Sequence, residues 1–271
     1  MSISSRAGLS AAVLALTLTA SACGGSSEEQ EKISIGIKFD QPGLGFKDHD
    51  GTFSGFDVDV ATYVAKQLGY EADQIEFKQV TSLDRELLLQ YGEVDYVVAS
   101  YSITDKRKAK IDFAGPYFTA HQDLMVRASD KTIKDASDLN SKRLCSVTGS
   151  TSARNVKEKL APKASMMELG NYSECAVALK DTFLDAMTTD NSILAGFAAQ
   201  KKYQGQFRLI GLSLSNEKYG IGVKKGKAEL RTKINAALKK MVQDGSWAEY
   251  VKTNFGPANY KSDPAPAITE G

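Results

Sequence analysis

Hydrophobic and polar positions repeat along the chain with two alternating periods. Residues 33–37 alternate as a β-strand does, whereas residues 56–69 place their apolar side chains on one helical face and end on Gly69, a common helix terminator. This succession of strand and helix continues along the chain. We expect further strands at residues 76–80, 96–99, 143–147 and 184–187, and helices at residues 84–91, 152–160, 175–180, 192–200, 228–241 and 247–251.

Such alternation predicts an α/β fold in which mainly parallel sheets carry helices on both faces. The 271 residues are enough for two ordinary lobes, each with its own core. Ligands of parallel sheets bind beyond the carboxyl ends of the strands. The loops that follow the predicted strands are therefore the first places to look for a site.

Composition excludes several classes of protein. A hydrophobic fraction of 42% and a charged fraction of 25% are ordinary for a globular protein and argue against a disordered or fibrous chain. The 34 basic and 33 acidic residues balance, so the surface as a whole has no reason to bind nucleic acid. With 2 His and 3 Cys, there is little material for a His-rich metal site or a disulfide scaffold. We expect neither a metal nor a cofactor.

The sequence motifs of common enzymes are also absent. There is no phosphate-binding loop, no dinucleotide-binding glycine pattern, no nucleophile elbow and no H-E-x-x-H zinc motif. His49 lies in a turn-rich stretch, His121 follows strand-like residues, and neither has a placed catalytic partner. We therefore expect both histidines to be structural and the protein not to be an enzyme.

The first 22 residues do not look like part of the fold. Arg6 precedes an apolar run at residues 7–20 that is too short to span a bilayer comfortably, and small residues lead from it to Cys23. This arrangement resembles a bacterial lipobox, in which a signal peptide (residues 1–22) is removed and Cys23 becomes the lipid-modified first residue. An ordinary signal peptide with an incidental cysteine is the alternative. Residues 23–32 would form a tether, with the body outside the cytoplasm and lipid-anchored to the outer face of the cell membrane.

Apart from Cys23, the cysteines of the chain are Cys145 and Cys175. If the protein is exported, as the signal peptide implies, both are in an oxidising compartment. An even pair of cysteines is more often bridged than free in such a compartment. We expect a disulfide across 30 residue steps, which would stabilise the fold by roughly 3–4 kcal/mol. Two buried free thiols are the alternative.

A series of short motifs follows one another in a specific order. It resembles bacterial solute-binding protein family 3, the polar amino-acid receptors of ABC importers, over essentially all of residues 33–256. The resemblance implies two α/β lobes joined by two crossing segments, with an amino acid held between the lobes. The motifs are G-F-D-V-D-V-A at residues 55–61, S-Y-S-I-T-D-K-R at 100–107, F-A-G-P-Y at 113–117, G-S-T-S at 149–152, D-A-M-T-T-D at 185–190 and Y-G-I-G-V at 219–223.

The resemblance also implies how the chain is divided. The crossing segments are expected near residues 121–125 and 212–219. The expected lobes are a first lobe made of residues 33–121 and 219–257 and a second lobe made of residues 122–218. Residues 258–271 are expected to form a flexible tail, because the chain beyond residue 257 is rich in Pro, Ala and Ser.

The α-carboxylate of the ligand is assigned to residues of the first lobe, by their match to the family. Arg107 offers a planar fork that holds a carboxylate with two hydrogen bonds. Ser100 and Ser102 follow the predicted strand at residues 96–99, where free backbone N–H groups add to the site. The alternative for Arg107 is a surface ion pair.

The second lobe is expected to complete the site for the α-groups. Ser150 and Thr151 lie at a strand-to-helix turn and can present hydroxyls and amides. Asp190 is the counter-charge for the α-ammonium, and a helix N-cap is its alternative role. Asp57 and Asp59 are assigned to structure instead, because they flank a helix amino end where negative charge is favourable.

Three further residues are expected to contact the side chain of the ligand. Lys38 follows the first strand, at a position that is acidic in many relatives. Ser82 and Arg85 lie in a segment similar to the one by which glutamate/aspartate receptors hold the distal carboxylate. The stretch K-F-D-Q-P-G at residues 38–43 is similar to the glutamate receptors of Gram-positive bacteria.

Charge counting then predicts the ligand. Arg107 and Asp190 serve the α-groups, so Lys38 and Arg85 remain for the side chain, and a cationic ligand would be repelled. We predict L-glutamate, with aspartate next, and the sequence leaves glutamine open. In the alternative, both cations turn away from the ligand and pair with neighbouring aspartates.

The resemblance implies a mechanism and partners. The first lobe binds the amino acid, the second closes on it, and the closed form meets membrane permease subunits served by a separate ATPase. The receptor is expected to be a monomer. The alternatives are a dehydratase-like enzyme of the same fold and a sensor domain. The enzyme would require an acid or base placed in the cleft, which we do not find in the sequence. The sensor would usually require a transmembrane link to a signalling partner, which we do not find either.

Overall fold

The computed structural model describes residues 31–271, which form one compact unit. A nine-stranded mixed sheet runs through this unit in the order β5-β1-β6-β12-β7-β10-β8-β9, with β11 also paired to β7. A second sheet has the order β2-β3-β4. The strands are β1 (Ile33–Ile37), β2 (Asp40–Gln41), β3 (Gly45–Lys47), β4 (Phe53–Ser54), β5 (Ile75–Gln79), β6 (Tyr96–Val98), β7 (Asp112–Arg127), β8 (Arg143–Val147), β9 (Ser165–Leu169), β10 (Ala186–Asp190), β11 (Phe207–Leu209) and β12 (Asn216–Val223).

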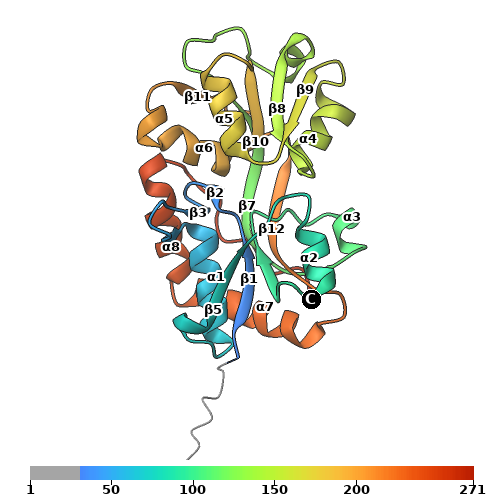
Figure 1. The fold of residues 1–271 in the computed structure, drawn as a ribbon, viewed down its shortest axis with the longest axis vertical. Helices are drawn as coiled ribbons and strands as arrows, with labels where there is room; N and C mark the ends of the chain where they lie inside the picture. The colour runs from blue at the N-terminus through green and yellow to red at the C-terminus, as the bar shows by residue number, and fades with distance from the viewer. Residues whose placement is uncertain (1–30) are drawn as a thin grey trace, which may run out of the picture. The chain divides into compact units, whose positions relative to one another are not determined.

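Helices cover the sheet in both halves of the molecule (Figure 1). In α1 the buried residues include Phe56, Val60 and Val64, which recur at helical spacing and pack into the core. The helices are α1 (Phe56–Gln67), α2 (Arg85–Tyr91), α3 (Asp105–Lys108), α4 (Thr151–Asn155), α5 (Tyr172–Lys180), α6 (Asn191–Ala199), α7 (Ala228–Gln243) and α8 (Ser246–Phe255). Shorter helical turns are η1 (Ala72–Gln74), η2 (Ala136–Ser141), η3 (Val156–Leu160), η4 (Lys201–Tyr203) and η5 (Gly256–Ala258).

Strand β7 belongs to both lobes. Its first part pairs antiparallel with β12 as far as His121, and from Gln122 onward it pairs antiparallel with β10. One lobe is therefore built on β5, β1, β6 and β12, and the other on β10, β8 and β9, with β7 passing between them (Figure 1). This arrangement confirms the predicted two-lobe α/β fold.

The sheet is less uniformly parallel than the sequence led us to expect. The β1–β5, β1–β6, β8–β9 and β8–β10 pairs are parallel, whereas β7 and β12 are antiparallel to their neighbours. The pattern of residues 112–127 did not reveal one continuous strand, because Gly115 and Pro116 interrupt it and its second half contains polar His121 and Gln122. The long strand is nevertheless almost entirely buried, since both lobes pack against it.

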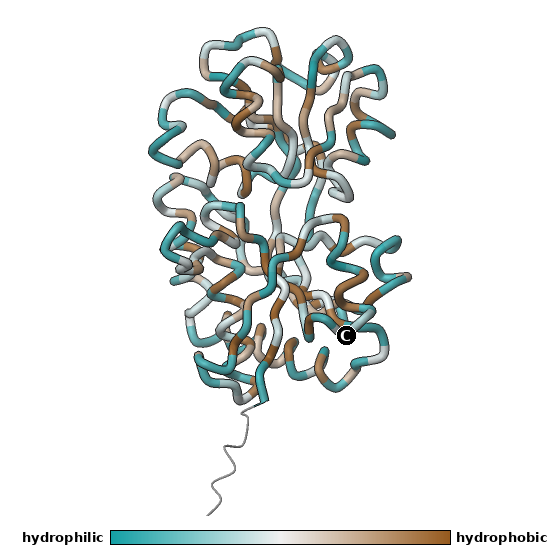
Figure 2. Tube along the Cα trace, in the orientation of Figure 1, coloured by the Kyte–Doolittle hydropathy of each residue, from teal (hydrophilic) through white to brown (hydrophobic). Residues whose placement is uncertain are grey.

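The core is apolar and partly aromatic, and hydrophobic residues concentrate inside both lobes (Figure 2). In the first lobe, the ring centroid of Phe118 lies 5.2 Å from that of Phe56 and 5.2 Å from that of Phe255. In the second lobe, a disulfide joins Cys145 of β8 to Cys175 of α5. The bridge ties α5 to the sheet close to the amino end of the helix.

Residues 258–271 differ from the flexible tail that their composition led us to expect. The backbone N–H groups of Thr269 and Glu270 both donate to the carbonyl of Gly115, at 2.9 and 3.0 Å. The Asp263 carboxylate lies 2.9 Å from Nε2 of His121. Because these bonds are made to distant residues of the first lobe, composition alone could not predict them.

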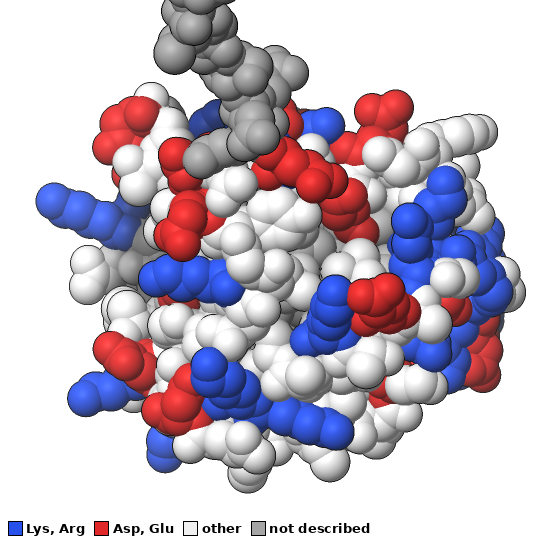
Figure 3. Space-filling model, turned by 90° about the horizontal axis from the view of Figure 1, so that it is seen from below, with Lys and Arg blue, Asp and Glu red and all other residues white. Residues whose placement is uncertain are grey.

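The predicted signal peptide, the lipidation site Cys23 and most of the tether lie outside the described residues. Among residues 31–271, no helix is both long and apolar enough to cross a membrane. In the view from below (Figure 3), basic and acidic side chains are interspersed with uncharged ones wherever the face is not covered by grey atoms. This mixture agrees with the net charge of +1 and gives that face no field of one sign.

Candidate ligand-binding site

A small polar cavity lies where the two lobes meet. Eight of the nine predicted ligand-binding residues line it, and the ninth, Lys38, lies directly behind Ser82. The lining residues are Ser82, Arg85, Ser100, Ser102, Arg107, Ser150, Thr151, Ser152, Tyr172, Asp190 and Ile193.

Asp57 holds Ser100 at the edge of the cavity. Ser100 follows β6 with a φ of 42°, its N–H donates to Asp57 Oδ2 at 2.8 Å, and its hydroxyl donates to Gln41 Oε1 at 2.8 Å. The other oxygen of Asp57 accepts a bond from the Tyr117 hydroxyl at 2.7 Å. Burial raises the pKa of Asp57 to about 6. The aspartate that we assigned to structure therefore shapes the site without lining it.

Arg107 spans the boundary between the lobes. Its guanidinium donates to the carbonyl of Ser102 at 2.7 Å and, across the boundary, to the carbonyl of Gly149 at 3.1 Å. Its Nε lies 3.4 Å from Glu86 Oε1. Burial, and then the charge of Arg85, lowers the pKa of Arg107 to about 10. Arg107 is thus not in the surface ion pair that was its alternative, because only 4% of it is exposed.

Arg85 is stacked and only partly hydrogen-bonded. Its guanidinium carbon lies 3.8 Å from the centroid of the Tyr101 ring, and one of its terminal nitrogens donates to the carbonyl of Ala99 at 2.9 Å. Its Nε is buried and has no hydrogen-bond partner among the described residues. A buried donor without a partner is costly and marks a place where a ligand atom can bind.

Lys38 is a buried cation beside Ser82. Its Nζ donates to the Ser82 hydroxyl at 3.1 Å, and within residues 31–271 it makes no ion pair. The alternative pairing is absent, because Asp40 accepts bonds from the start of α5 and Asp84 accepts one from Thr81 N–H. Burial, and then the nearby charge of Arg85, lowers the pKa of Lys38 to about 7.

Asp190 lies opposite these cations, on the second lobe. It is the last residue of β10, which extends three residues beyond the strand predicted at residues 184–187 because β10 pairs with β7 up to Asp190. Its Oδ2 accepts a bond from the Tyr219 hydroxyl at 2.5 Å, and its Oδ1 is buried without a partner among the described residues. Burial, and then the charge of Glu217, raises its pKa to about 7. It occupies the N-cap position of α6 without capping the helix through its side chain.

The second-lobe wall also carries the hydroxyl groups of Ser150, Thr151 and Ser152, and Tyr172 and Ile193 complete it. Ser150 caps α4 by accepting a bond from Ala153 N–H at 3.0 Å, and its Oγ lies 3.2 Å from that of Ser146. The preceding Gly149 has a φ of 80°, and a Cβ there would meet the carbonyl oxygen of Ser82 at 2.7 Å. Glycine is required because the backbones of the two lobes come this close.

Several residues that shape the site were missed in the sequence. Glu86 and Tyr101 adjoin predicted residues, and the Tyr101 hydroxyl donates to Glu86 Oε1 at 2.9 Å. Tyr172 follows Asn171, whose side chain caps α5 by accepting a bond from Glu174 N–H. Tyr219 lies in the Y-G-I-G-V motif. Their positions beside motif residues were the available signal, but contact across lobes is not visible in one sequence.

The cavity is almost filled by its own lining. Its free volume is about 10 Å³, close to the least that holds one water molecule. An amino acid therefore fits only when lining side chains turn or the lobes move apart. Arg107 is bonded to a carbonyl of each lobe, so these bonds must break when its guanidinium turns or the lobes separate.

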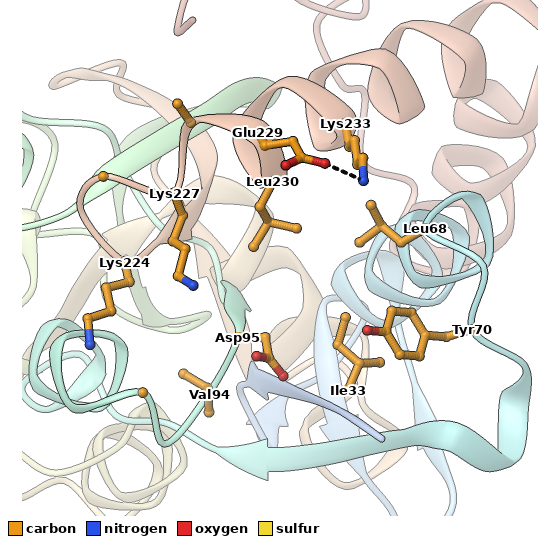
Figure 4. A pocket seen from close by; sticks show the side chains of 13 residues that line it. Ile33, Leu68, Tyr70, Val94, Asp95, Lys224, Lys227, Glu229, Leu230 and Lys233 are labelled. Carbon is orange, nitrogen blue, oxygen red and sulfur yellow. Dashed lines mark ion pairs between the residues drawn. The ribbon is translucent and has the colours of Figure 1, made fainter. Parts of the chain in front are cut away.

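A larger pocket of about 670 Å³ lies in the first lobe (Figure 4). None of the predicted site residues lines it. Its charged groups, such as Lys224, Lys227 and Asp95, are exposed, and Glu229 and Lys233 pair with each other at 2.7 Å. Exposed charges remain hydrated and contribute little to binding. The buried cavity between the lobes is the better candidate.

The donor set of the cavity is suited to a charged organic solute. Within residues 31–271, no group of three or more His, Cys, Asp or Glu side chains could hold a metal ion. Cations on one wall, with hydroxyls and one carboxylate on the other, can hold a molecule that carries both signs of charge. Two lobes that enclose such a cavity define a solute-binding protein.

Comparison with known proteins gives the same class. The chain belongs to the bacterial extracellular solute-binding proteins, family 3, which it matches over residues 33–257. It is 43% identical to the glutamate-binding protein GluB of Corynebacterium efficiens, over 92% of this chain and 90% of that one. It is 41% identical to the ABC transporter glutamine-binding protein GlnH of Bacillus subtilis, over 88% of this chain and 84% of that one. An ancestral arginine-binding protein bound to arginine superposes with a TM-score of 0.78 at 36% identity, over 84% of this chain and 99% of that one.

Proposed function

We propose that this protein is the extracytoplasmic receptor of an ABC amino-acid importer and that it binds L-glutamate, with aspartate as the next best ligand. The observation that most strongly supports an acidic ligand is the pair of buried cations Lys38 and Arg85. Neither makes an ion pair among the described residues, and they are 4% and 2% exposed.

The charges of the site favour an acidic side chain. Arg107 and Asp190 serve the α-carboxylate and α-ammonium of any amino acid, so Lys38 and Arg85 are in excess. A buried charge without a partner costs several kcal/mol, and a carboxylate on the ligand would offset that cost. A lysine or arginine ligand would instead add a positive charge to the two cations already in excess, Lys38 and Arg85, and would be repelled. The similarity to GluB supports this assignment.

Glutamine is the second candidate. Lys38 has a pKa of about 7, so close to neutrality it is uncharged in a substantial part of the molecules. An uncharged amine hydrogen-bonds to an amide without an ionic penalty. The similarity to GlnH supports this alternative. The two ligands differ in the charge that they bring to Lys38, and this difference can be tested.

Binding proceeds in two steps in this proposal. The first lobe, residues 33–121 and 219–257, takes the ligand through Arg107 and the cations, and the second lobe, residues 122–218, closes on it with Ser150, Thr151 and Asp190. Arg107 exchanges the carbonyl of Gly149 for the ligand carboxylate. The closed form then docks to permease subunits, and a separate ATPase supplies the energy.

The ligand assignment is tested by native mass spectrometry of the purified protein. A bound mass equal to that of glutamate is the expected result. A bound mass equal to that of arginine, lysine or histidine would refute the acidic ligand. The mass of glutamine differs by about one unit, so the released ligand is identified by amino-acid analysis.

The lipid anchor is a separate part of the proposal. It rests on the lipobox-like residues before Cys23 and requires that this cysteine carry the lipid. In Cys23→Ser the protein should leave the membrane fraction, and globomycin should block processing of the wild type. Unchanged membrane association in Cys23→Ser would contradict the anchor and leave the ligand assignment intact.

A further inference from the structure

The lobes also meet outside the ligand cavity, where the β2–β3 turn of the first lobe lies against the start of α5 and the middle of α6. In Figure 1, β2 and β3 lie directly below α6. Both helices contact β2. The pocket beside this contact is lined by Pro42 and Gly196, neither of which lines the ligand cavity. Pro42 and Gly196 therefore meet for a reason other than lining the ligand cavity, and this contact needs its own explanation.

Asp40 caps a helix of the opposite lobe. Its Oδ2 accepts bonds from the N–H groups of Tyr172 and Ser173, at 3.0 and 3.2 Å. These are the first two residues of α5, whose N–H groups have no partner inside the helix. Asn171 caps the same helix from its own lobe through Glu174 N–H. The second cap therefore exists only while the lobes are together.

Gly196 allows α6 to approach the first lobe. A Cβ at this position would lie within 3.0 Å of the carbonyl oxygen of Pro42, closer than real Cβ atoms come to any neighbour. The clash is with backbone, which cannot turn away as a flexible side chain can. Any residue larger than glycine would hold the two lobes apart at this point.

The position of Gly196 within α6 makes glycine costly there. Its φ is not in the left-handed region, so no turn or helix end requires glycine. In a helix interior glycine is less favourable than alanine by roughly 0.8–1 kcal/mol. In the described structure the feature that requires glycine is the approach of Pro42, which belongs to the other lobe.

We propose that Gly196 and Asp40 are positioning residues for ligand capture. They form a closure contact that stabilises the liganded, closed form without touching the ligand. The contact tightens binding of every ligand by the same factor and does not select among ligands. This inference rests on the proposed function, since it assumes capture by closure of two lobes.

The decisive variant is Gly196→Ala, with Gly170→Ala as the matched control. Gly170 also lies in the second lobe, its φ is outside the left-handed region, and a Cβ there would meet nothing within 4 Å. We expect Gly196→Ala to weaken glutamate binding at least about tenfold. The loss should appear as faster dissociation in stopped-flow measurements. Gly170→Ala should bind as the wild type does.

Thermal unfolding without ligand separates closure from simple damage. Alanine favours the α6 helix, so the midpoint of free Gly196→Ala should equal or exceed that of the wild type. Weaker binding together with an equal or higher midpoint is the result that a merely structural glycine would not give. Wild-type affinity in Gly196→Ala, or a midpoint lowered in step with the affinity, would overturn the inference.

Asp40 supplies an independent arm of the test. Asp40→Ala should weaken binding and speed dissociation, and Asp40→Asn should restore part of the loss because its amide oxygen still accepts from α5. Equal affinity in Asp40→Ala and the wild type would contradict the role of Asp40.

Failure of the ligand assignment is distinguishable from failure of this inference. If the wild type binds another amino acid instead of glutamate, the ligand assignment is wrong, and the variants are compared with that amino acid. If the wild type binds no amino acid at all, both proposals are wrong. A Gly196→Ala protein that binds normally contradicts the closure contact alone.

Discussion

The two walls of the ligand cavity differ in the kind of groups that they carry. The first-lobe wall carries the cations Arg85 and Arg107 beside the hydroxyls of Ser82, Ser100 and Ser102, and Lys38 donates a hydrogen bond to Ser82. The second-lobe wall also carries hydroxyls, those of Ser150, Thr151 and Ser152, but its one charged group is the carboxylate of Asp190, and Tyr172 and Ile193 complete it. In the proposed function, the first wall holds the groups for the ligand side chain together with Arg107 for its α-carboxylate, and the second wall holds groups that suit any amino acid.

This difference indicates a division of labour between the lobes. The cations of the first lobe carry costs of burial, seen in the lowered pKa values of Lys38 and Arg107. Those costs are accepted where a ligand brings the opposite charge. The second lobe adds contacts of modest strength when it closes. Substitutions in the first wall should therefore change which ligand binds or abolish binding, whereas substitutions in the second should change how tightly all ligands bind.

The largest effect is expected from Arg107→Ala. Removing a buried charged partner of the ligand carboxylate should weaken binding of glutamate and glutamine alike, on the order of a hundredfold to a thousandfold. Arg107→Lys should recover little, because lysine lacks the planar fork. Calorimetry measures both ligands, with Arg231→Ala on α7 as a control. A loss below tenfold would show that the α-carboxylate binds elsewhere.

Asp190→Asn should have the next largest effect. Loss of the counter-charge should weaken both ligands about tenfold to a hundredfold, in equal proportion. Asparagine still accepts the bond from Tyr219, and it removes a buried carboxylate oxygen that has no partner among the described residues. The free protein should therefore be as stable as the wild type or more stable in thermal unfolding. If Asp190→Asn weakened binding of only one of the two ligands, the proposed difference in role between the two cavity walls would be wrong.

Lys38→Met should change specificity. We expect about tenfold weaker glutamate binding and little change for glutamine, because one charge-assisted bond is lost only with the acid. Removing a buried unpaired cation should also raise the stability of the free protein by about 1 kcal/mol. Competition between the two ligands in equilibrium dialysis measures the ratio directly. Equal losses for both ligands would mean that Lys38 does not distinguish their side chains.

Changes of pH should give the smallest effect, with a different sign for each wall. A ligand carboxylate raises the pKa of Lys38 from about 7, so binding takes up a proton and glutamate affinity falls as the pH rises above about 7. A ligand ammonium lowers the pKa of Asp190 from about 7, so binding releases a proton and the affinity of both ligands falls below about pH 7.

The ratio of glutamate to glutamine affinity should therefore decrease only on the alkaline side, and in total by no more than the roughly tenfold loss expected for Lys38→Met. Titrations in two buffers of different ionisation enthalpy report the protons exchanged. Lys38→Met should remove the alkaline decrease. A ratio that stays constant up to pH 9 would contradict the role of Lys38.

The sequence predicted which polar residues come together more completely than it predicted the sheet. Strand ends were the expected places for a site, and the resemblance to the family implied that residues of both lobes meet there; Ser100, Ser150 and Asp190 do line one cavity. The long β7 was not predicted, since a strand shared by two lobes is buried on all sides and shows no period of two.

Contacts between distant elements could not be predicted from local patterns. The approach of Glu86 to Arg107 depends on the orientation of α2, and the bond from Arg107 to Gly149 depends on how the lobes meet. Residues 258–271 were misread for the same reason, because their partners lie in β7 and α7. Local periodicity describes elements, whereas these contacts depend on the packing of the whole chain.

The central claim is that an excess of buried cations selects an acidic ligand. Its most direct test is a calorimetric titration of the wild-type protein at pH 7 with L-glutamate, L-glutamine and L-lysine. We predict micromolar or tighter binding of glutamate, about −8 kcal/mol or better, weaker binding of glutamine and no heat with lysine. Binding of lysine as tight as that of glutamate would contradict the claim.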